Sequence, residues 1–404
     1  MLTAMLFLAF AVPAGTAAAA GVDSYVSLGD SYTSAPLVPN QVGTPPGCAR
    51  SDHNYPSLVA VAIGATSFRD VSCSGAKTTD MTAPQAVPNG TNPPQLDALS
   101  NDTQLVTIGI GGNDEGLVDV ATTCARLGLL APTGTACRDN FASGGNDSVV
   151  ARIAATAPKV AAVLQGIRER APAARIVVVG YPGVLPRSGN GCYPLVPFSG
   201  DDVRYFDGLI VQTNEMLAQQ AATNGAEFAD TYLDSVGHDV CTLPGTKWFE
   251  GLVPTAAALP LHPNALGMQS MARSVTAVVS RPRPGPVLGP LVRGKGSISR
   301  GRPARFGYRL DRPATVAVVV QRLEGGRRRG AACRKPSRAN RRARSCLRPV
   351  VVGRMGALGR AGENSLAVGA TVYGRRAGLY RLTATPVSDE IEGPPQVAQF
   401  RVAR

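Results

Sequence analysis

Short apolar runs alternate with longer amphipathic stretches from Gly21 to about Ser280. The short runs predict five β-strands, at Ser24–Leu28, Ser67–Ser72, Leu105–Ile110, Ile176–Tyr181 and Glu227–Ala229. The longer stretches predict helices, at Tyr55–Ile63, Leu117–Leu127, Ser148–Arg170, Asp201–Thr223 and Ala265–Val279. Strands that alternate with crossover helices are typical of a parallel sheet with helices on both faces. The pattern therefore predicts one doubly wound α/β domain, whose chemistry gathers beyond the carboxyl ends of the strands.

The pattern changes after residue 280. Arg281–Pro286 holds three prolines and a glycine, which prevent a helix from continuing and predict a linker. Beyond it, alternating apolar and polar runs are separated by Gly and Pro turns, at Ala304–Leu310, Thr315–Gln321, Val350–Val352, Ser365–Val368, Tyr380–Thr385 and Val397–Val402. Such runs are typical of a small β-sandwich. We therefore expect an α/β domain at 21–280, a linker at 281–286 and an all-β, sandwich-like domain at 287–404.

Residues 1–20 resemble an export signal. An apolar run from Met5 to Val12 is followed by small residues up to Ala20, as in a signal peptide and its cleavage site. The run is too short to span a bilayer, which needs about 20 apolar residues. No Lys or Arg precedes it, so the true start of the chain stays open. We expect a mature, extracellular protein that begins near Gly21.

Cysteine usage agrees with export. The chain has eight cysteines and no Cys-x-x-Cys pair, which disfavours zinc ribbons and thioredoxin-like sites. An even count in an exported protein favours disulfides. Pairing sequence neighbours joins Cys48 to Cys73, Cys124 to Cys137, Cys192 to Cys241 and Cys333 to Cys346, although spacing alone does not establish this connectivity.

Charge separates the two parts of the chain. Residues 284–404 hold 25 Lys and Arg against 6 Asp and Glu, a net charge of +19, whereas the remainder carries −6. Ten of these cations and no acid lie between Arg327 and Arg348, which we call the basic segment. It could attract an anionic envelope polymer or lipid surface, or it could be a solvated loop. No motif indicates specific nucleic-acid binding.

Four places carry candidate chemistry, and the first is Gly29-Asp30-Ser31 at the end of the first predicted strand. A serine there lies at the sheet edge where open α/β folds expose functional groups. The same three residues are also a good turn. The Gly-x-Ser-x-Gly elbow of other serine hydrolases is absent from the chain.

Two glycine-containing turns follow later strands. Gly111-Gly-Asn113-Asp114 ends the third strand, and the Asn113 amide could donate to a developing oxyanion. Gly75, after the second strand, could offer an unobstructed backbone N–H to the same oxyanion. Each is equally compatible with an ordinary turn.

The fourth place is His262, just before the last helix of the α/β part. The chain has three histidines, and His53 and His238 lie in loops where a structural or exposed role fits better. His262 is therefore the candidate general base.

Taken in this order, the four places resemble the conserved blocks of the SGNH/GDSL hydrolase family, over about residues 23–278. The wider pattern is similar to the secreted actinobacterial esterase, lipase and phospholipase branch. The resemblance implies a flavodoxin-like, three-layer α/β/α domain with a five-stranded parallel sheet. It also implies the first three disulfides above and an oxyanion hole formed by the Ser31 N–H, the Gly75 N–H and the Asn113 amide.

One position departs from the family pattern. Many members carry Asp three residues before the histidine, where this sequence has Leu259. Some secreted members use a backbone carbonyl instead, so the resemblance implies a Ser31–His262 dyad with the Leu259 carbonyl accepting from the ring. The chemistry survives this change because the third group mainly fixes the tautomer and orientation of the imidazole.

These residues predict a secreted esterase or lipase that forms an acyl-Ser31 intermediate, acts as a monomer and needs no metal or cofactor. Phospholipase A and polysaccharide deacetylase activities are alternatives within the same chemistry. An envelope-binding protein with the α/β domain as a mere scaffold is the alternative from another class. A scaffold, however, has no physical need to keep Ser, Gly, Asn and His together.

Overall fold

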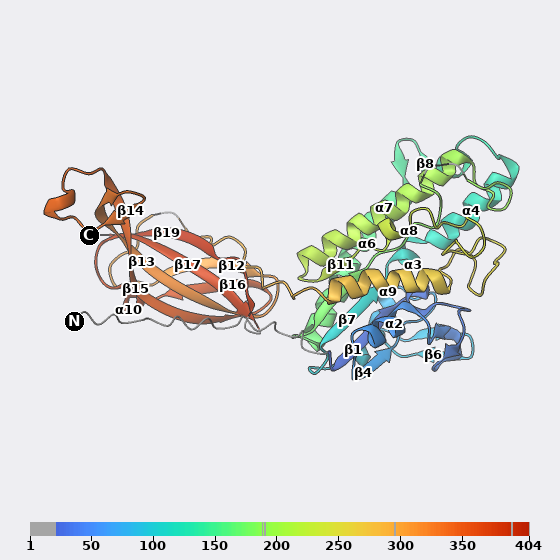
Figure 1. Cartoon of the computed structure of the whole chain (residues 1–404), viewed down its shortest axis with the longest axis horizontal. Helices are drawn as coiled ribbons and strands as arrows, with labels where there is room; N and C mark the ends of the chain where they lie inside the picture. The colour runs from blue at the N-terminus through green and yellow to red at the C-terminus, as the bar shows by residue number, and fades with distance from the viewer. Residues whose placement is uncertain (1–21, 188, 190, 295, 389–390, 404) are drawn as a thin grey trace, which may run out of the picture.

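The computed structural model describes residues 22–187, 189, 191–294, 296–388 and 391–403, which form an α/β part and an all-β part (Figure 1). The predicted signal peptide lies outside these residues. Five parallel strands in the order β11-β10-β7-β1-β4 form the sheet of the α/β part. Their bounds are Ser24–Gly29 (β1), Ser67–Asp70 (β4), Leu105–Gly109 (β7), Arg175–Val179 (β10) and Glu227–Ala229 (β11). The predicted five-stranded parallel sheet is thus confirmed.

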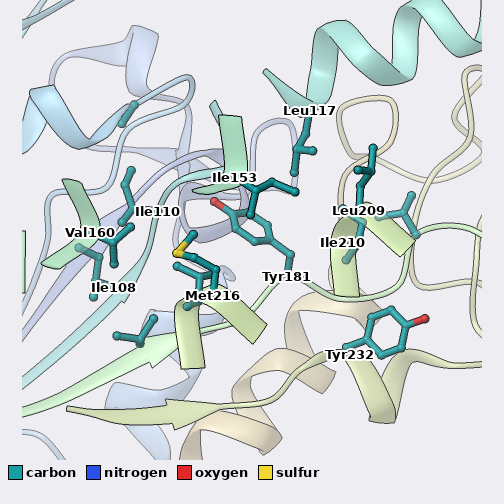
Figure 2. Packing of buried hydrophobic residues seen from close by; sticks show 14 of the residues in the cluster. Ile108, Ile110, Leu117, Ile153, Val160, Tyr181, Leu209, Ile210, Met216 and Tyr232 are labelled. Carbon is teal, nitrogen blue, oxygen red and sulfur yellow. The ribbon is translucent and has the colours of Figure 1, made fainter. Parts of the chain in front are cut away.

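Helices cover both faces of this sheet. Strand side chains on one face of the sheet, such as Tyr25 and Val177, pack with α2 (Tyr55–Ala62) and α9 (Ala265–Val279). Strand side chains on the other face, such as Ile108, pack with α4 (Leu117–Leu130), α6 (Ser148–Arg170) and α7 (Gly200–Thr223). Because successive strand side chains point to opposite faces, the nearly continuous apolar runs fill two cores. Figure 2 shows part of the second core.

The α/β part also contains short helices and short hairpins. The short helices are α1 (Ser31–Ser34), α3 (Gly112–Glu115), α5 (Ala136–Phe141) and α8 (Tyr232–Ser235). The short hairpins pair β2 (Gln41–Val42) with β3 (Arg50–Ser51), β5 (Gln85–Val87) with β6 (Gly90–Asn92), and β8 (Ala142–Ser143) with β9 (Asn146–Asp147). Among the described helices, α6 alone is long and apolar enough to cross a membrane by composition. Its apolar face packs in the core of the α/β part.

The all-β part contains two antiparallel sheets around a separate core. One pairs β12 (Ala304–Leu310) with β16 (Gly362–Val368). The other holds β13 (Ala314–Arg329), β14 (Ala332–Arg334), β15 (Ser345–Gly359), β17 (Gly378–Ser388), β18 (Ile391–Glu392) and β19 (Gln396–Val402). Its core includes the aromatic side chains of Phe306, Tyr380 and Phe400, with Tyr373 from the short helix α10 (Ala370–Tyr373). Alternate burial along β12 and β17 agrees with the predicted all-β architecture.

The basic segment differs from the expected loop. Strands β13 and β15 are longer than the runs that predicted them, and their ladder continues through Arg327, which pairs with Ser345. Strand β14 also pairs with the end of β13, where Arg328 lies opposite Cys333. Backbone hydrogen bonds need no apolar face, so alternation of hydrophobic residues could not reveal this part of the ladder. The segment is a hairpin extension at the end of the sheet remote from the α/β part (Figure 1).

The structure contains four disulfides, and they join the sequence neighbours named above. Three lie in the α/β part, between Cys48 and Cys73, Cys124 and Cys137, and Cys192 and Cys241. The fourth, between Cys333 and Cys346, links β14 to β15 inside the basic segment. No described cysteine is free.

Candidate active site

Ser31 lies where the sequence placed it, at the carboxyl edge of the sheet. Strand β1 ends at Gly29, and Asp30 caps helix α1 by accepting a hydrogen bond of 2.9 Å from the Tyr32 N–H. Gly29 has a φ of +148°, and a β-carbon there would lie 2.6 Å from the Gly109 carbonyl oxygen. Only glycine fits this tight exit from the strand, which puts Ser31 at the first position of α1.

His262 contacts Ser31 directly. Its Nε2 atom lies 2.8 Å from the Ser31 Oγ atom, and its Nδ1 atom lies 2.9 Å from the Pro260 carbonyl oxygen. The ring is 4% exposed. Burial lowers the pKa of His262, although the hydrogen bond to Pro260 partly opposes this. The neutral imidazole is therefore favoured, with Nε2 free to accept the serine proton.

The expectation that Leu259 supplies the orienting carbonyl is wrong, because Pro260 contacts the ring instead. The Leu259 carbonyl accepts a hydrogen bond of 3.1 Å from the His262 backbone N–H. This turn closes because Leu261 adopts a left-handed φ of +60°. The turn directs the Leu259 carbonyl at the backbone and leaves the Pro260 carbonyl facing the imidazole.

A buried ion pair supports the loop that carries His262. The Glu250 carboxylate contacts the Lys247 ammonium at 2.9 Å and accepts from the Asn264 side chain at 2.8 Å. Burial alone would raise the pKa of Glu250, but hydrogen bonds from Asn264, Lys247 and Thr255 outweigh it and lower the pKa to about 2. The Glu250 backbone also pairs with Leu261 and His262. No sequence pattern predicted this support, because acidic residues in loops are usually solvated.

Tyr32 joins the two halves of the dyad. Its hydroxyl donates to the Leu261 carbonyl at 2.6 Å, and its ring centroid lies 4.9 Å from that of His262. The residue that follows Ser31 in the chain thus also holds the loop that carries the histidine.

The Asn113 turn packs beside the loop that contains Gly75. The Asn113 Nδ2 atom donates to the Ala76 carbonyl at 2.9 Å, and Asp114 accepts from the backbone N–H and hydroxyl of Thr78. The second amide hydrogen of Asn113 stays available, since an NH₂ group donates twice. Asp114 fastens the loop and does not line the pocket beside Ser31.

Two backbone N–H groups expected to face an oxyanion are unengaged. Within the described residues, neither Ser31 nor Gly75 donates its backbone N–H to another protein group. Gly75 has a φ of +77° in the turn after Cys73. Ser31, Asn113 and His262 line one pocket, whereas Gly75 is not among its lining residues.

The pocket beside Ser31 is largely apolar. It encloses about 670 Å³ of empty space, part of which is open to solvent. Beyond the dyad its walls come from α4, α7 and the loop after β10, with the side chains of Leu117, Val118, Ala121, Val184, Leu185, Phe198, Phe206 and Ile210. Figure 2 shows Leu117 and Ile210 near Tyr181. Such walls suit an acyl chain better than a sugar or a charged group.

The other two histidines lie elsewhere. His53 is exposed and contacts Asp52. His238 stacks on Trp248 with ring centroids 3.8 Å apart and contacts the Thr246 carbonyl. No cluster of three or more His, Cys, Asp or Glu side chains that could hold a metal occurs in the described part of the chain.

Comparison with known proteins gives a consistent result. Residues 27–270 match the sequence profile of the GDSL-like lipase/acylhydrolase family. Lipase 2 of Streptomyces coelicolor is 37% identical over 262 residues, which cover 63% of this chain and 85% of that protein. The match to the family profile ends before the all-β part begins.

Two solved structures are similar to the α/β part. The extracellular lipase of Streptomyces rimosus has 30% sequence identity and a TM-score of 0.53, over 64% of this chain and 99% of that one. Phospholipase A1 of Streptomyces albidoflavus has 27% identity and the same TM-score, over 64% of this chain and 100% of that one.

Proposed function

Since the chain belongs to the GDSL-like lipase/acylhydrolase family and is a carboxylic ester hydrolase, we propose that Ser31 and His262 carry out its reaction. The observation that carries the proposal is the contact of 2.8 Å between the serine Oγ and the imidazole Nε2. His262 takes the serine proton as Ser31 Oγ attacks the ester carbonyl, and the protonated imidazole then gives that proton to the leaving alkoxide, so that the alcohol departs and an acyl-Ser31 forms. Water then attacks this intermediate with His262 again as base, which releases the acid and restores the serine.

The Pro260 carbonyl orients the His262 imidazole, as the Asp carboxylate does in Ser-His-Asp triads. It accepts from Nδ1–H, which fixes the tautomer that leaves Nε2 unprotonated. A carbonyl carries no full negative charge, so it stabilises the imidazolium less than a carboxylate would. Burial of the ring adds to this cost.

We assign the oxyanion hole to the backbone N–H groups of Ser31 and Gly75 and the side-chain amide of Asn113. Each of these three groups has an N–H that donates to no described protein group. Donors held before the reaction begins stabilise the developing charge without reorganising, which is why such groups lower the barrier strongly.

The substrate we propose is an ester or lipid with an apolar acyl chain. The side chains beyond Ser31 and His262 are mostly aliphatic and aromatic, and among the described residues no Lys or Arg that would bind an anionic group lines the pocket. Phospholipase A activity fits the same pocket if the headgroup stays outside it. A polysaccharide deacetylase would leave most of the apolar wall unused.

Turnover of three substrate classes by purified protein tests this proposal. We expect nitrophenyl esters to show kcat/KM rising from acetyl to medium-length chains, because each buried methylene contributes about 0.8 kcal/mol. A phospholipid and an acetylated glycan complete the set. A preference for the acetylated glycan over every acyl ester would overturn the assignment of an acyl-chain pocket.

We also propose that the protein acts outside the cell. Four disulfides support this, because disulfides persist in oxidising compartments. The similar lipase of S. rimosus is extracellular. Mass analysis of culture medium and of the mature N-terminus would test export.

For the domain organisation we propose bounds of 21–280 and 287–404, with the linker 281–286 between them. Separate buried cores on the two sides of the linker support this division. We further propose that the basic segment binds an anionic envelope polymer or lipid surface. Its exposed arginines, among them Arg341, Arg342 and Arg344, support this role.

A further inference from the structure

Tyr181 lies at the centre of the carboxyl edge of the sheet. It follows β10 by two residues, and its backbone is held on both sides by Asn214 of α7. The Tyr181 N–H donates to Asn214 Oδ1 at 2.8 Å, and Asn214 Nδ2 donates to the Tyr181 carbonyl at 2.7 Å. The ring is 4% exposed and packs among apolar side chains of α4, α6 and α7 (Figure 2). Tyr181 is thus fixed before any substrate binds.

The Tyr181 hydroxyl makes two hydrogen bonds to different turns. It donates to Asp30 Oδ2 at 2.5 Å and accepts from the Gly112 N–H at 2.9 Å. Both bonds are buried. Burial, with the nearby Asp30 carboxylate, keeps the pKa of the phenol well above its ordinary value, so the hydroxyl stays protonated. Burial also raises the pKa of Asp30 to about 7, against the lowering effect of the bond from Tyr181.

Each bond ends next to a residue of the proposed chemistry. Asp30 precedes Ser31 and caps its helix. Gly112 precedes Asn113, whose amide belongs to the proposed oxyanion hole. One oxygen atom therefore ties the turn after β1 to the turn after β7, from a third strand that lies beside β7.

We propose that Tyr181 is a positioning residue that sets the distance between the Ser31 nucleophile and the Asn113 oxyanion donor. The inference rests on the function proposed above. Tyr181 follows a third strand, β10, and contacts neither the transferred proton nor the developing oxyanion. It therefore acts only by holding the turns that carry Ser31 and Asn113. Without the hydroxyl, the two turns lose their shared anchor, and the donor no longer meets the oxyanion at the best distance. Small misplacements of this kind reduce turnover strongly and leave ground-state binding largely intact.

The test is Tyr181→Phe, with Tyr232→Phe as the matched control. Tyr232 is also a buried tyrosine whose hydroxyl donates to a buried carboxylate, Asp207, at 2.7 Å, but it does not line the pocket. On a soluble nitrophenyl ester we expect Tyr181→Phe to lower kcat about 10- to 100-fold with KM changed less than about twofold. The control should keep kcat within about twofold. Equal kcat values for the two variants would overturn the proposal.

A second readout separates positioning from general loosening of the fold. An alkyl boronic acid adds to the serine and places an oxygen where the oxyanion forms. Its inhibition constant should weaken in Tyr181→Phe by the same factor as kcat/KM, whereas the matching fatty alcohol should bind as before. Equal weakening of both ligands would mean that the pocket as a whole has changed, which would contradict a positioning role.

Two further variants keep the proposal testable whatever the stability of Tyr181→Phe. Tyr181→Phe with Asn113→Ala should lose little more kcat than Asn113→Ala alone, because Tyr181 acts through Asn113. If the kcat losses of the two single variants multiply in the double variant, Tyr181 does not act through Asn113, which would overturn the proposal. In Gly112→Ala the added carbon would lie 3.1 Å from the Tyr181 hydroxyl. The substitution therefore displaces the Gly112 turn from the hydroxyl while the phenol itself is kept. Wild-type kcat in Gly112→Ala would also count against the proposal. Full activity of Ser31→Ala would instead refute the proposed function.

Discussion

The Nε2 atom of His262 lies 2.8 Å from the Oγ atom of Ser31, although 231 residues separate the two in the chain. Ser31 begins the helix that leaves β1, and His262 lies in the loop just before α9. The carboxyl ends of parallel strands meet at one edge of the sheet, so these two connections converge. Because the nucleophile and the base act together, replacing either one should abolish ester hydrolysis.

Ser31→Ala and His262→Ala should each remove almost all ester hydrolysis. Removal of either member of a cooperating pair lowers kcat by about 10⁶-fold, and removal of both costs little more. The measurement is turnover of a nitrophenyl ester by the two single variants and the double variant, with circular dichroism as the check on folding. Near wild-type turnover by folded Ser31→Ala would falsify the assignment.

The acidic limb of the pH profile should report His262. Burial lowers the pKa of His262 from about 6.5, and only the neutral ring accepts the serine proton. Activity therefore rises with pH through that lowered pKa, and the acidic half-maximum of kcat/KM should lie below about pH 6.5. The chain has three histidines, so NMR of histidine-labelled protein, with His262→Ala to identify the signal, measures the same pKa directly. A half-maximum above pH 7 would contradict the buried neutral imidazole.

Asn113→Ala should lower kcat by roughly 100- to 1000-fold, the range found when one oxyanion donor is removed. KM should change much less, because the amide acts mainly in the transition state. Part of any loss could come from the bond between Asn113 and the Ala76 carbonyl. Asn113→Asp keeps the size of the side chain but, when ionised, can donate neither to the oxyanion nor to the Ala76 carbonyl, so it should be at least as impaired as Asn113→Ala. Recovery of activity in Asn113→Asp would show that the amide donor is not needed.

Glu250→Gln should destabilise the protein near neutral pH. It leaves the Lys247 ammonium buried without its carboxylate, and breaking a buried pair in this way costs about 3 to 5 kcal/mol. The pKa of Glu250 is lowered to about 2, so its ionised form stabilises the fold above about pH 4.5. That contribution is lost as pH falls toward 2. Urea unfolding should therefore show a large difference between wild type and Glu250→Gln at pH 7 and a much smaller one near pH 2.

The matched control is Glu227→Gln, which alters an ion pair with Arg175 that lies away from the histidine loop. Glu250→Gln should also lower kcat, since the Glu250 backbone and side chain hold the loop of His262. The control should leave kcat unchanged. Equal effects of the two substitutions on kcat would mean that the loop does not depend on Glu250.

Much of the fold followed from the alternation of apolar runs, because buried parallel strands and amphipathic helices have distinct periods. The five strands of the α/β sheet, and helices such as Ser148–Arg170, were predicted nearly to the residue. The ladder of β13 and β15 through the basic segment was not, because paired strands without a buried face leave no alternation to detect.

The residues of the site also fall into those that the sequence predicted and those that it did not. Ser31, Asn113 and His262 could be found because each follows a recognisable strand end or precedes a helix. The Pro260 carbonyl could not, since its direction depends on the backbone angles at Leu261. Tyr181 was also missed: its partner Asp30 is 151 residues away, and no local pattern distinguishes a clamping tyrosine from one in the core.

The all-β part should be dispensable for ester hydrolysis. Every group proposed for the chemistry precedes the linker, so a chain ending at Arg283 should hydrolyse a small soluble ester with kcat close to that of the full chain. The contacts that close α9 survive this truncation, because Arg175 donates to the carbonyls of Val278, Val279 and Arg281. A folded but inactive truncated protein would contradict the independence of the two parts.

If the basic segment binds anionic surfaces, the full chain should bind vesicles rich in anionic lipid at low salt and the truncated chain should not. Binding should fade as salt rises, because the Debye length falls from about 30 Å at 0.01 M to about 10 Å at 0.1 M. Replacing Arg341, Arg342 and Arg344 with Gln in the full chain should remove most of the binding and leave soluble-ester turnover unchanged. The control replaces three exposed arginines outside the segment, Arg305, Arg354 and Arg360, so that both variants lose the same charge. If both sets weaken binding equally, net charge alone is responsible; binding only to an anionic polymer would assign the surface to the cell envelope.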